Sequence, residues 1–526
     1  MIALAAAGYR YPAGTAVGPV DLRVAPGELV LLTGPTGCGK STVLRLAAGI
    51  LQRHGHGVVT GAVTLGDRDP ASLIAADRVR TLGFVGQDPD DAVVAATCAA
   101  EIAFGAESAG WAPDRIEARV TTLLHRLGLA ARANRAPSAL SGGQRQRLVI
   151  GAALVAGAGA LLLDEPLSQL DPEGAHAVMA LLRELADDGV AVLCVEHRLE
   201  IAMPYAHRTL LMDAGRIVAD PVSDAAALRA RGLAGPMVRE LEERTGGTRW
   251  RVRADTVTHA SVASDVSLRS ASSRPISGVI HAANLSFAWP GEPRCVTDVS
   301  LDIQAGERVA LVGANGAGKS TLLGLVAGRL RPARGAVRAT GRVVEVPQNP
   351  DLALFCETVH AELAYGPVEA RRSPADVAAT VARAAAALSV ADLLHRPPQA
   401  LSRGQRLRTA VAAALACAPR LLVMDEPTSG QDRDQVDRML AALPDALPGG
   451  AVLFASHDLD VVLRHATRVI VLDAGRIVAD GPPLATLLAA ETRGLPLPLP
   501  PLARVCAALG VPYAAPEQLA AWLEAE

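Results

Sequence analysis

The sequence predicts an α/β fold that is built twice within one chain. The phosphate-loop pattern GPTGCGKST at 34–42 recurs as GANGAGKST at 313–321, and each copy lies between a strand-like apolar run and a helical pattern. The length agrees, because 526 residues exceed what one hydrophobic core of ordinary size supports. We therefore expect two domains of similar architecture, at 1–244 and 278–526, joined by a linker at 245–277.

Charge and cysteine usage argue against several classes of protein. The formal net charge is −3, so no polybasic surface for nucleic acid is indicated. The seven cysteines are scattered singly, which fits a reducing compartment better than a disulfide framework. The N-terminus lacks a signal-peptide pattern, and the longest apolar run, at 148–163, is shorter than the roughly 18 residues that span a bilayer. If the protein serves a membrane, we expect it to do so from outside the lipid.

An internal repeat extends well beyond the phosphate loops. Lys319 follows Lys40 by 279 positions, whereas Gln87, Ser141 and Asp164 each recur 261 positions later. The difference of 18 positions predicts a deletion after the first helix of the second copy. Ordered identities at constant spacing indicate a duplication.

The segment at 245–277 is rich in Ser, Thr and Arg and poor in large apolar residues. This composition predicts a flexible tether. The alternative is that RWRVRADTV at 249–257 forms an edge strand, because its residues alternate in character.

Both phosphate loops have the context that phosphate binding requires. ELVLLTG at 28–34 and ERVALVG at 307–313 lead into them as strands, and glycines allow backbone N–H groups to converge on phosphate oxygens at a helix N-terminus. We expect Lys40 and Lys319 to reach the β- and γ-phosphates, and the hydroxyls of Ser41 and Ser320 to face Mg²⁺. The expected ATP-binding residues of the loops are Gly34, Pro35, Thr36, Gly37, Cys38, Gly39, Lys40, Ser41, Thr42, Gly313, Ala314, Asn315, Gly316, Ala317, Gly318, Lys319, Ser320 and Thr321.

Paired carboxylates end a second apolar run in each half, ALLLDEP at 160–166 and RLLVMDEP at 420–427. Asp164 and Asp425 are placed to hold Mg²⁺, usually through water. Glu165 and Glu426 are candidates for the general base that polarises the attacking water. The alternative, that these acids only end strands at the solvent, does not explain why they recur after a phosphate loop.

With these motifs, both halves resemble ATP-binding cassette (ABC) nucleotide-binding domains, and LSGGQRQRL at 140–148 matches the signature motif of that family. The resemblance implies P-loop NTPase domains, each with a RecA-like α/β core, an antiparallel β subdomain and a helical subdomain. It implies ATP and Mg²⁺ as cofactors. It also implies Q-loops at Gln87 and Gln348 that serve catalysis and the metal, D-loops at 168–171 and 429–432, and switch histidines at His197 and His457.

The same resemblance implies that Tyr11 and Trp289 stack on adenine. The alternative for each is an aromatic side chain that caps its own strand.

Cassettes of this family close head to tail, which implies two composite ATP sites. One would combine the phosphate loop of the first half with Ser402, Arg403, Gly404 and Gln405, and the other would combine the loop of the second half with Ser141, Gly142, Gly143 and Gln144. Arg403 stands where the first copy has Gly142, so LSRGQ replaces LSGGQ. Arg403 either turns into solvent without effect or makes the two sites turn over ATP at different rates.

The segments after the Q-loop glutamines share Q-x-P-D and A-E-[IL]-A-[FY]-G in register. This pattern resembles the ATPases of energy-coupling factor (ECF) transporters, which drive a transmembrane scaffold and a substrate-capturing membrane protein for vitamins or transition-metal ions. Glu101 and Glu362 are candidates for contact with arginines of the scaffold, with solvated helix-face acids as the alternative. The resemblance implies a peripheral protein at the cytoplasmic face of the membrane.

Two other functions share the nucleotide motifs. ATPases of other ABC importers, such as those for sugars, are disfavoured only by the segments after the Q-loops. Soluble twin-cassette ATPases that act on ribosomes or nucleic acid are disfavoured by the short, Ser/Thr-rich tether and the near-neutral charge.

Two further features carry expectations. Cys38 lies inside the first phosphate loop, where a helix N-terminus would lower its pKa and make it open to alkylation. After a proline-rich run, 503–509 and 516–526 are expected to be helical, either to hold paired ATPases together or to cover the core.

Overall fold

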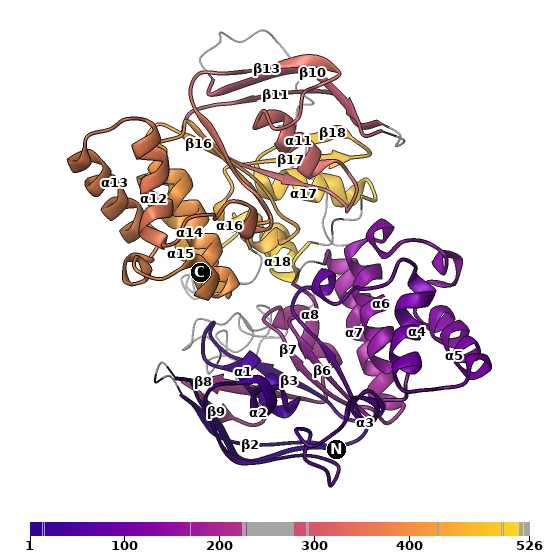
Figure 1. Ribbon diagram of the computed structural model, residues 1–526. Coiled ribbons are helices and arrows are strands. Elements are labelled where there is room, and N and C mark those ends of the chain that lie inside the picture. Colours follow the sequence, from indigo (N-terminus) through magenta and orange to yellow (C-terminus); the bar gives the residue numbers. More distant parts are fainter. Residues whose placement is uncertain are drawn as a thin grey trace. The chain divides into compact units, whose positions relative to one another are not determined.

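The computed structural model describes residues 1–12, 14, 16–168, 170–222, 228, 278–290, 294–428, 431–495, 497, 499–514 and 519. The expected linker at 245–277 lies outside these residues. The chain divides into two compact units, Met1–Pro236 and Met237–Glu526. Each unit is described by itself, with the first drawn in indigo to magenta and the second in salmon to yellow in Figure 1.

Each unit is built on a six-stranded sheet with one strand order. In the first unit the order is β5–β6–β7–β3–β8–β9, with bounds Leu82–Val85, Ala160–Asp164, Ala191–Val195, Leu29–Thr33, Arg208–Asp213 and Arg216–Ala219. In the second it is β14–β15–β16–β12–β17–β18, with bounds Val343–Val346, Leu421–Asp425, Ala451–Ala455, Arg308–Val312, Arg468–Asp473 and Arg476–Gly481. All pairs are parallel except the last in each sheet. Strands buried on both faces explain the continuous apolar runs of the sequence.

A small antiparallel sheet accompanies each large one. It has the order β2–β1–β4 in the first unit, with bounds Ala16–Val24, Ile2–Arg10 and Val58–Leu65, and β11–β10–β13 in the second, with bounds Arg294–Ile303, Ile280–Ala288 and Arg334–Ala339. The predicted α/β class, with a RecA-like core and an antiparallel β subdomain in each half, is confirmed.

The helices of each unit form two groups. Helices α1, α2, α3, α7 and α8 span Lys40–Ala47, Ile50–His54, Ala75–Thr81, Pro172–Asp187 and Leu199–Ala202, and α11, α15, α16, α17 and α18 span Lys319–Val326, Arg433–Ala446, Leu459–His465, Pro483–Thr492 and Pro501–Leu509. The helical subdomains are α4, α5 and α6, at Cys98–Ser108, Pro113–Arg126 and Gly142–Leu154, and α12, α13 and α14, at Val359–Glu369, Pro374–Ala387 and Arg403–Ala416.

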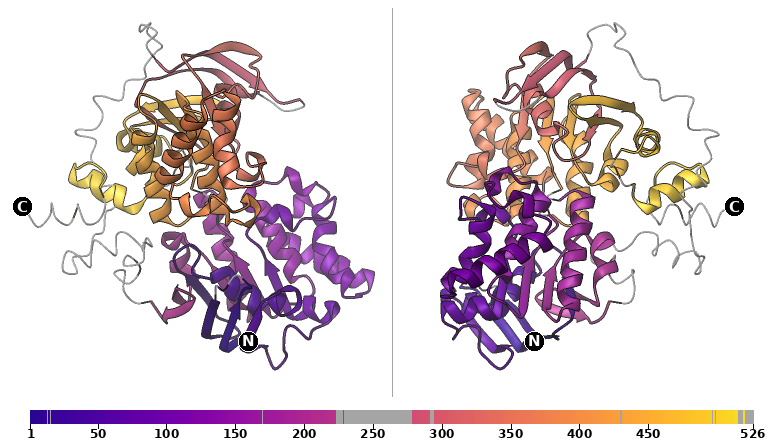
Figure 2. Two further views of the ribbon diagram at one scale, coloured as in Figure 1. Left: turned by 60° about the vertical axis from the view of Figure 1, so that its left-hand side comes forward. Right: turned by 90° about the vertical axis from the view of Figure 1, so that its right-hand side faces the viewer.

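In Figures 1 and 2 the helices of each subdomain stand as a group at one side of their sheet. Helix α18, in yellow, lies at the border of the second unit in both views of Figure 2. No helix formed by the described residues combines the length and the apolar character needed to cross a membrane.

The 18-position difference between the repeats has a structural counterpart. In the first unit α2 and α3 lie between α1 and β5, whereas the described residues between α11 and β14 form only strand β13. The deletion therefore removes surface helices and leaves the sheet intact.

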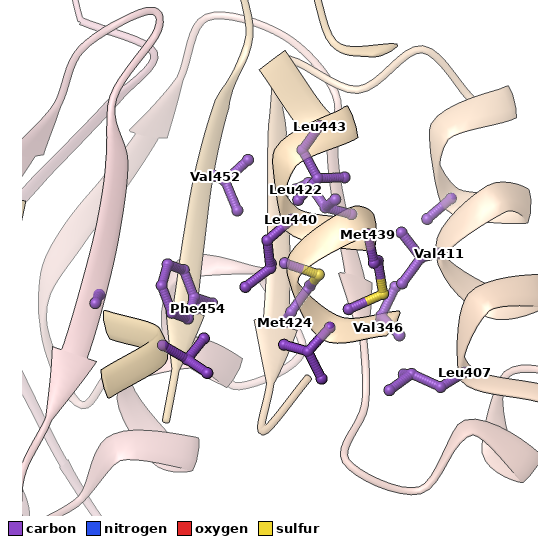
Figure 3. Packing of buried hydrophobic residues seen from close by; sticks show 14 of the residues in the cluster. Val346, Leu407, Val411, Leu422, Met424, Met439, Leu440, Leu443, Val452 and Phe454 are labelled. Atoms are coloured by element: carbon purple, nitrogen blue, oxygen red, sulfur yellow. The ribbon is translucent and has the colours of Figure 1, made fainter. Parts of the chain in front are cut away.

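The core of the second unit lies between its sheet and the helices that cover it (Figure 3). Phe454 on β16 is 1% exposed and is the largest fully buried side chain among the described residues. Leu440 and Met439 of α15 pack in the same cluster with Leu422 and Met424 of β15. This packing holds α15 against the sheet.

We predict that Phe454→Ala lowers the free energy of unfolding of the second unit by about 3–5 kcal/mol, because it removes a buried ring and leaves a cavity. Phe454→Leu, which refills much of the volume, should cost about 1.5 kcal/mol or less. Chemical denaturation measures both values, and equal losses for the two variants would contradict the packing described.

Candidate functional site

The phosphate loops lie at the carboxyl ends of the central strands β3 and β12. Gly39 and Gly318 precede helices α1 and α11 with φ of 107° and 100°, in the left-handed region. A Cβ on Gly39 would lie 2.6 Å from the Val17 side chain, and one on Gly318 would lie 2.4 Å from the carbonyl oxygen of Cys295. Glycine is therefore required on two grounds, conformation and space.

The two loop lysines are buried and folded onto their own loops. Lys40 Nζ donates to the carbonyl oxygens of Gly34 and Pro35 at 2.8 and 2.9 Å. Lys319 repeats both bonds at 2.7 and 3.1 Å. Each ammonium group is thus held at the centre of a loop, where phosphate oxygens can replace the carbonyl oxygens as its partners.

The predicted adenine-stacking residues lie beside the phosphate loops. Tyr11 Oη is 2.9 Å from Thr42 Oγ1, and Trp289 Nε1 donates to Thr321 Oγ1 at 3.4 Å. These contacts fix the distance of each ring from its loop. Their role in stacking on adenine stays a prediction.

Asp164 and Asp425 end strands β6 and β15 and are buried. Ser41 Oγ donates to Asp164 Oδ1 at 3.0 Å. Burial raises the pKa of both aspartates, and the charge of Glu165 adds to the effect at Asp164. The charges of Arg45 and Lys40 near Asp164, and of Lys319 near Asp425, act in the opposite direction but do not offset burial.

The oxygen donors fit Mg²⁺ as a partner of bound phosphate. A hydroxyl and a carboxylate lie together at Ser41 and Asp164, and Mg²⁺ usually completes its shell with water and phosphate oxygens. Within the described residues no cluster of three or more His, Cys, Asp and Glu side chains could hold a metal. Mg²⁺, if bound here, would take its remaining ligands from water and phosphate oxygens.

The candidate general bases adopt an uncommon backbone conformation. Glu165 and Glu426 have φ of 50° and 52°, in the left-handed region that non-glycine residues adopt uncommonly. Each pairs with the predicted switch histidine: His197 Nε2 lies 3.1 Å from Glu165 Oε1, and His457 Nδ1 lies 2.9 Å from Glu426 Oε1. The structure thus brings base and histidine together in each unit.

The charge state of Glu165 suits a base. Burial opposes ionisation, but the charges of His197 and Lys40 outweigh it, so the pKa of Glu165 lies below its ordinary value. Gln87 Nε2 donates to Glu165 Oε2 at 2.8 Å. In the second unit the backbone N–H of His457 is 3.4 Å from the carboxylate of Glu426. A contact of Gln87 or Gln348 with a metal stays a prediction.

A second carboxylate of the first unit was missed from the sequence. Glu196 is 2% exposed and accepts hydrogen bonds from the backbone N–H groups of Leu167, His197 and Arg198 at 3.1, 2.8 and 3.0 Å. It thereby joins the D-loop region to the switch histidine. Ser456 occupies this position in the second unit, so comparison of VEH with ASH in the repeat was the available signal.

The signature residues begin helices α6 and α14. Ser141 and Ser402 each form a capping box with the glutamine three residues later. Gly142 does not have a positive φ, so Arg403 can take the same backbone conformation without strain. The difference between the copies at this position is therefore the cation and not the backbone. Pairing of these residues with the opposite unit stays a prediction.

The expectation of a lowered pKa at Cys38 is wrong, and its alkylation stays a prediction. The side chain is 8% exposed, and burial raises the pKa of the thiol above its ordinary value despite the nearby charge of Lys40. The helix N-terminus does not compensate for the loss of solvation.

Glu101 and Glu362 neither face a partner nor lie in solvent, the two roles that the sequence suggested for them. Each is 4% exposed and folded inward. Glu101 accepts hydrogen bonds from the backbone N–H groups of Val94 and Ala95 at 2.9 and 2.7 Å, and Glu362 accepts one from that of Cys356. The carboxylates shape the loop before α4 and α12 rather than facing solvent.

Comparisons with known proteins agree with this geometry. The family model described as "ABC transporter" matches residues 17–168 and 296–429. A Methanosarcina mazei protein is 34% identical over 512 residues, covering 90% of this chain and 87% of its own length. A Streptomyces avermitilis protein is 37% identical over 519 residues, covering 90% of this chain and 92% of its own length. Their names provisionally assign both to the ABC transporter ATP-binding proteins, without a substrate.

Solved twin-cassette structures share the fold. The structure named "RNase-L Inhibitor" aligns with a TM-score of 0.58 at 20% identity, covering 93% of each chain. A model of ribosome-bound archaeal Pelota and ABCE1 aligns with a TM-score of 0.62 at 21% identity, covering 92% of this chain and 80% of that one. At this identity the likeness concerns the fold alone.

We predict that Asp425→Asn stabilises the nucleotide-free protein at neutral pH. Since the folded pKa of Asp425 is raised, the wild type loses stability as pH rises from its ordinary value of 3.8 through the folded value. The advantage of the variant should therefore grow from pH 4 to pH 7, with a rise in Tm of about 2–4 °C for each kcal/mol. Thermal unfolding across this range measures it, and an advantage independent of pH would contradict the burial cost.

We predict that Glu196→Gln lowers kcat for ATP about tenfold, because a glutamine has only one acceptor oxygen for three buried N–H donors. Glu184→Gln, at an exposed position of α7, is the control and should leave kcat unchanged. Steady-state ATPase assays compare the two variants. Equal activities would show that Glu196 is not needed to hold the histidine and the loop.

Proposed function

The chain belongs to the ABC transporter family of ATP-binding proteins, and from this membership we propose that it is the ATPase of a membrane transporter of the ECF type. The proposed cargo class is a vitamin or a transition-metal ion. The observation that carries the proposal is a pair of exposed apolar surfaces beside the helical subdomains, each formed by the segment after a Q-loop glutamine.

ATP hydrolysis follows from the family, and the geometry supports definite roles. Lys40 and Lys319 hold phosphate, Glu165 and Glu426 each accept a proton from an attacking water, and the paired histidines orient the carboxylates. Mg²⁺, when bound with ATP, would neutralise phosphate charge beside Asp164 and Asp425. Bound ATP would hold the two units closed and hydrolysis would release them.

We name the exposed apolar side chains of the second unit the docking surface: Leu352, Phe355, Tyr365 and Val368. They are 78%, 65%, 48% and 54% exposed. Phe355 and Tyr365 stack edge to face with ring centroids 4.9 Å apart. Aromatic side chains held rigidly in solvent are typical of the centre of a protein interface.

The first unit carries a smaller version of this surface. Val94 and Phe104 lie 261 positions before Phe355 and Tyr365, and they are 66% and 54% exposed. The buried carboxylates Glu101 and Glu362 hold the loops that carry Val94 and Phe355 against helices α4 and α12, which carry Phe104 and Tyr365. Recurrence of an exposed apolar pair supports two related contacts with one partner.

The proposed partner is a transmembrane scaffold with a short apolar helix for each surface, together with a substrate-capturing membrane protein. The names of the relatives support a transporter, and the shared A-E-[IL]-A-[FY]-G segments support the ECF type over other importers. The protein would then lie at the cytoplasmic face of the membrane. Action on ribosomes rests on fold likeness only and is an outcome of the test.

We predict that Phe355→Asp with Tyr365→Asp reduces the fraction of the chain that floats with native membranes by about tenfold or more, since charge replaces two aromatic anchors. ATP binding should be unchanged. Ile74→Asp is the matched control, because Ile74 is also 65% exposed and lies outside the docking surface. Density-gradient flotation with quantitative detection measures the fractions.

Two results would overturn the proposal. One is unchanged flotation of the double variant, which would remove the docking surface from the contact. The other is a wild-type chain that sediments with ribosomes and does not float with membranes, which would favour the soluble class.

A further inference from the structure

Two buried charges of the second unit connect the start of α15, just after the predicted D-loop, to the start of α16, just after the predicted switch histidine. Arg433 is the first residue of α15 and follows the D-loop directly. Asp460 is the second residue of α16 and lies three positions after His457. The Arg433 guanidinium pairs with Asp460 Oδ2, with only 20% and 10% of the two side chains exposed. This ion pair therefore spans the two catalytic segments.

The C-terminal segment, by which we mean residues 499–514, completes this group. The Tyr513 hydroxyl donates to the other carboxylate oxygen of Asp460, Oδ1. Each oxygen of Asp460 thus has a separate donor, and the donors come from different parts of the chain. A buried carboxylate is stable only when such partners are present.

Apolar packing fixes Tyr513 in this place. Leu502, Val505 and Cys506 of α18 are buried in a small cluster that includes Leu484 and Tyr513. Arg504 pairs with Glu491 of α17 at 2.5 Å. Leu497 and Leu499, which precede α18, are buried in the main core of the unit. The segment is therefore an integral layer of the second unit.

The first unit anchors its D-loop differently. Pro172 begins α7 at the position of Arg433, so the ion pair cannot form there. Arg198 instead donates to the carbonyl oxygens of Leu167 and Leu170 at 3.0 and 2.7 Å, and Glu196 accepts from the Leu167 N–H. These contacts all come from the strand–histidine segment of the same unit.

We propose that the C-terminal segment of this chain positions the catalytic loops of the second unit through Tyr513, Asp460 and Arg433. Tyr513 is a positioning residue, because it acts on His457 and the D-loop only through Asp460. The proposal depends on the ATPase activity alone and not on the transported substrate or the membrane partner. It makes turnover at Glu426 sensitive to the C-terminal segment, whereas turnover at Glu165 is not.

The test measures ATPase activity of Tyr513→Phe in two full-length backgrounds. Glu165→Gln leaves Glu426 as the active base, and Glu426→Gln leaves Glu165. We expect kcat to fall about fivefold in the Glu165→Gln background, the effect of losing one hydrogen bond of ordinary strength. KM for ATP should stay within about twofold, since no nucleotide contact is removed. In the Glu426→Gln background kcat should not change.

A second variant and a control separate positioning from loss of structure. Asp460→Asn, which keeps the shape and removes the charge, should reproduce the kcat defect in the same background. Tyr205→Phe removes a tyrosine hydroxyl next to His176 in the first unit and should change neither background. Equal losses of kcat in both backgrounds would overturn the proposal. So would an unchanged kcat in the Glu165→Gln background for Tyr513→Phe and for Asp460→Asn, each introduced singly.

Discussion

Two adjacent carboxylates at the end of a buried strand are the constraint on which the rest of each site depends. Asp164 with Glu165, and Asp425 with Glu426, place two negative charges where solvent is largely excluded. Such charges are costly unless cations, hydrogen-bond donors or a metal compensate them. The lysine, the serine hydroxyl and the histidine around each pair, and Gln87 in the first unit, provide part of this compensation.

The part of the burial cost that these groups leave uncompensated explains why the site is suited to a nucleotide. The pKa of Asp164 is raised by burial even though Ser41 donates to it, whereas the pKa of Glu165 is lowered by His197 and Lys40. The two carboxylates thus have different requirements: the pKa of the glutamate is lowered, as suits a base, whereas the cations near the aspartate do not offset its burial, so it needs further positive charge. A metal bound with phosphate would supply that charge, and binding would then stabilise the fold at the same point.

Sequence reasoning recovered what local patterns encode. The phosphate loops, the strand-terminal carboxylates and the histidines are short motifs whose backbone geometry follows from residue type, as at Gly39 and Gly318. It could not recover which side chains turn inward. Cys38 and Glu101 were assigned to a reactive and a partner-facing role, but both side chains are buried. Tyr513 and Asp460 are 53 positions apart, and no local pattern connects them.

Duplication gave both units the same catalytic residues, and the two units differ in the residues that hold these catalytic residues in place. The phosphate loop, the carboxylate pair and the histidine are retained twice. Glu196 and Arg198 support the first set, whereas Arg433, Asp460 and Tyr513 support the second. These supporting residues can change one at a time, because each change removes only a few hydrogen bonds. Loss of a general base or of a phosphate-loop lysine, in contrast, ends catalysis. Two ATP sites that differ in rate can therefore arise without any change in the residues that touch the nucleotide.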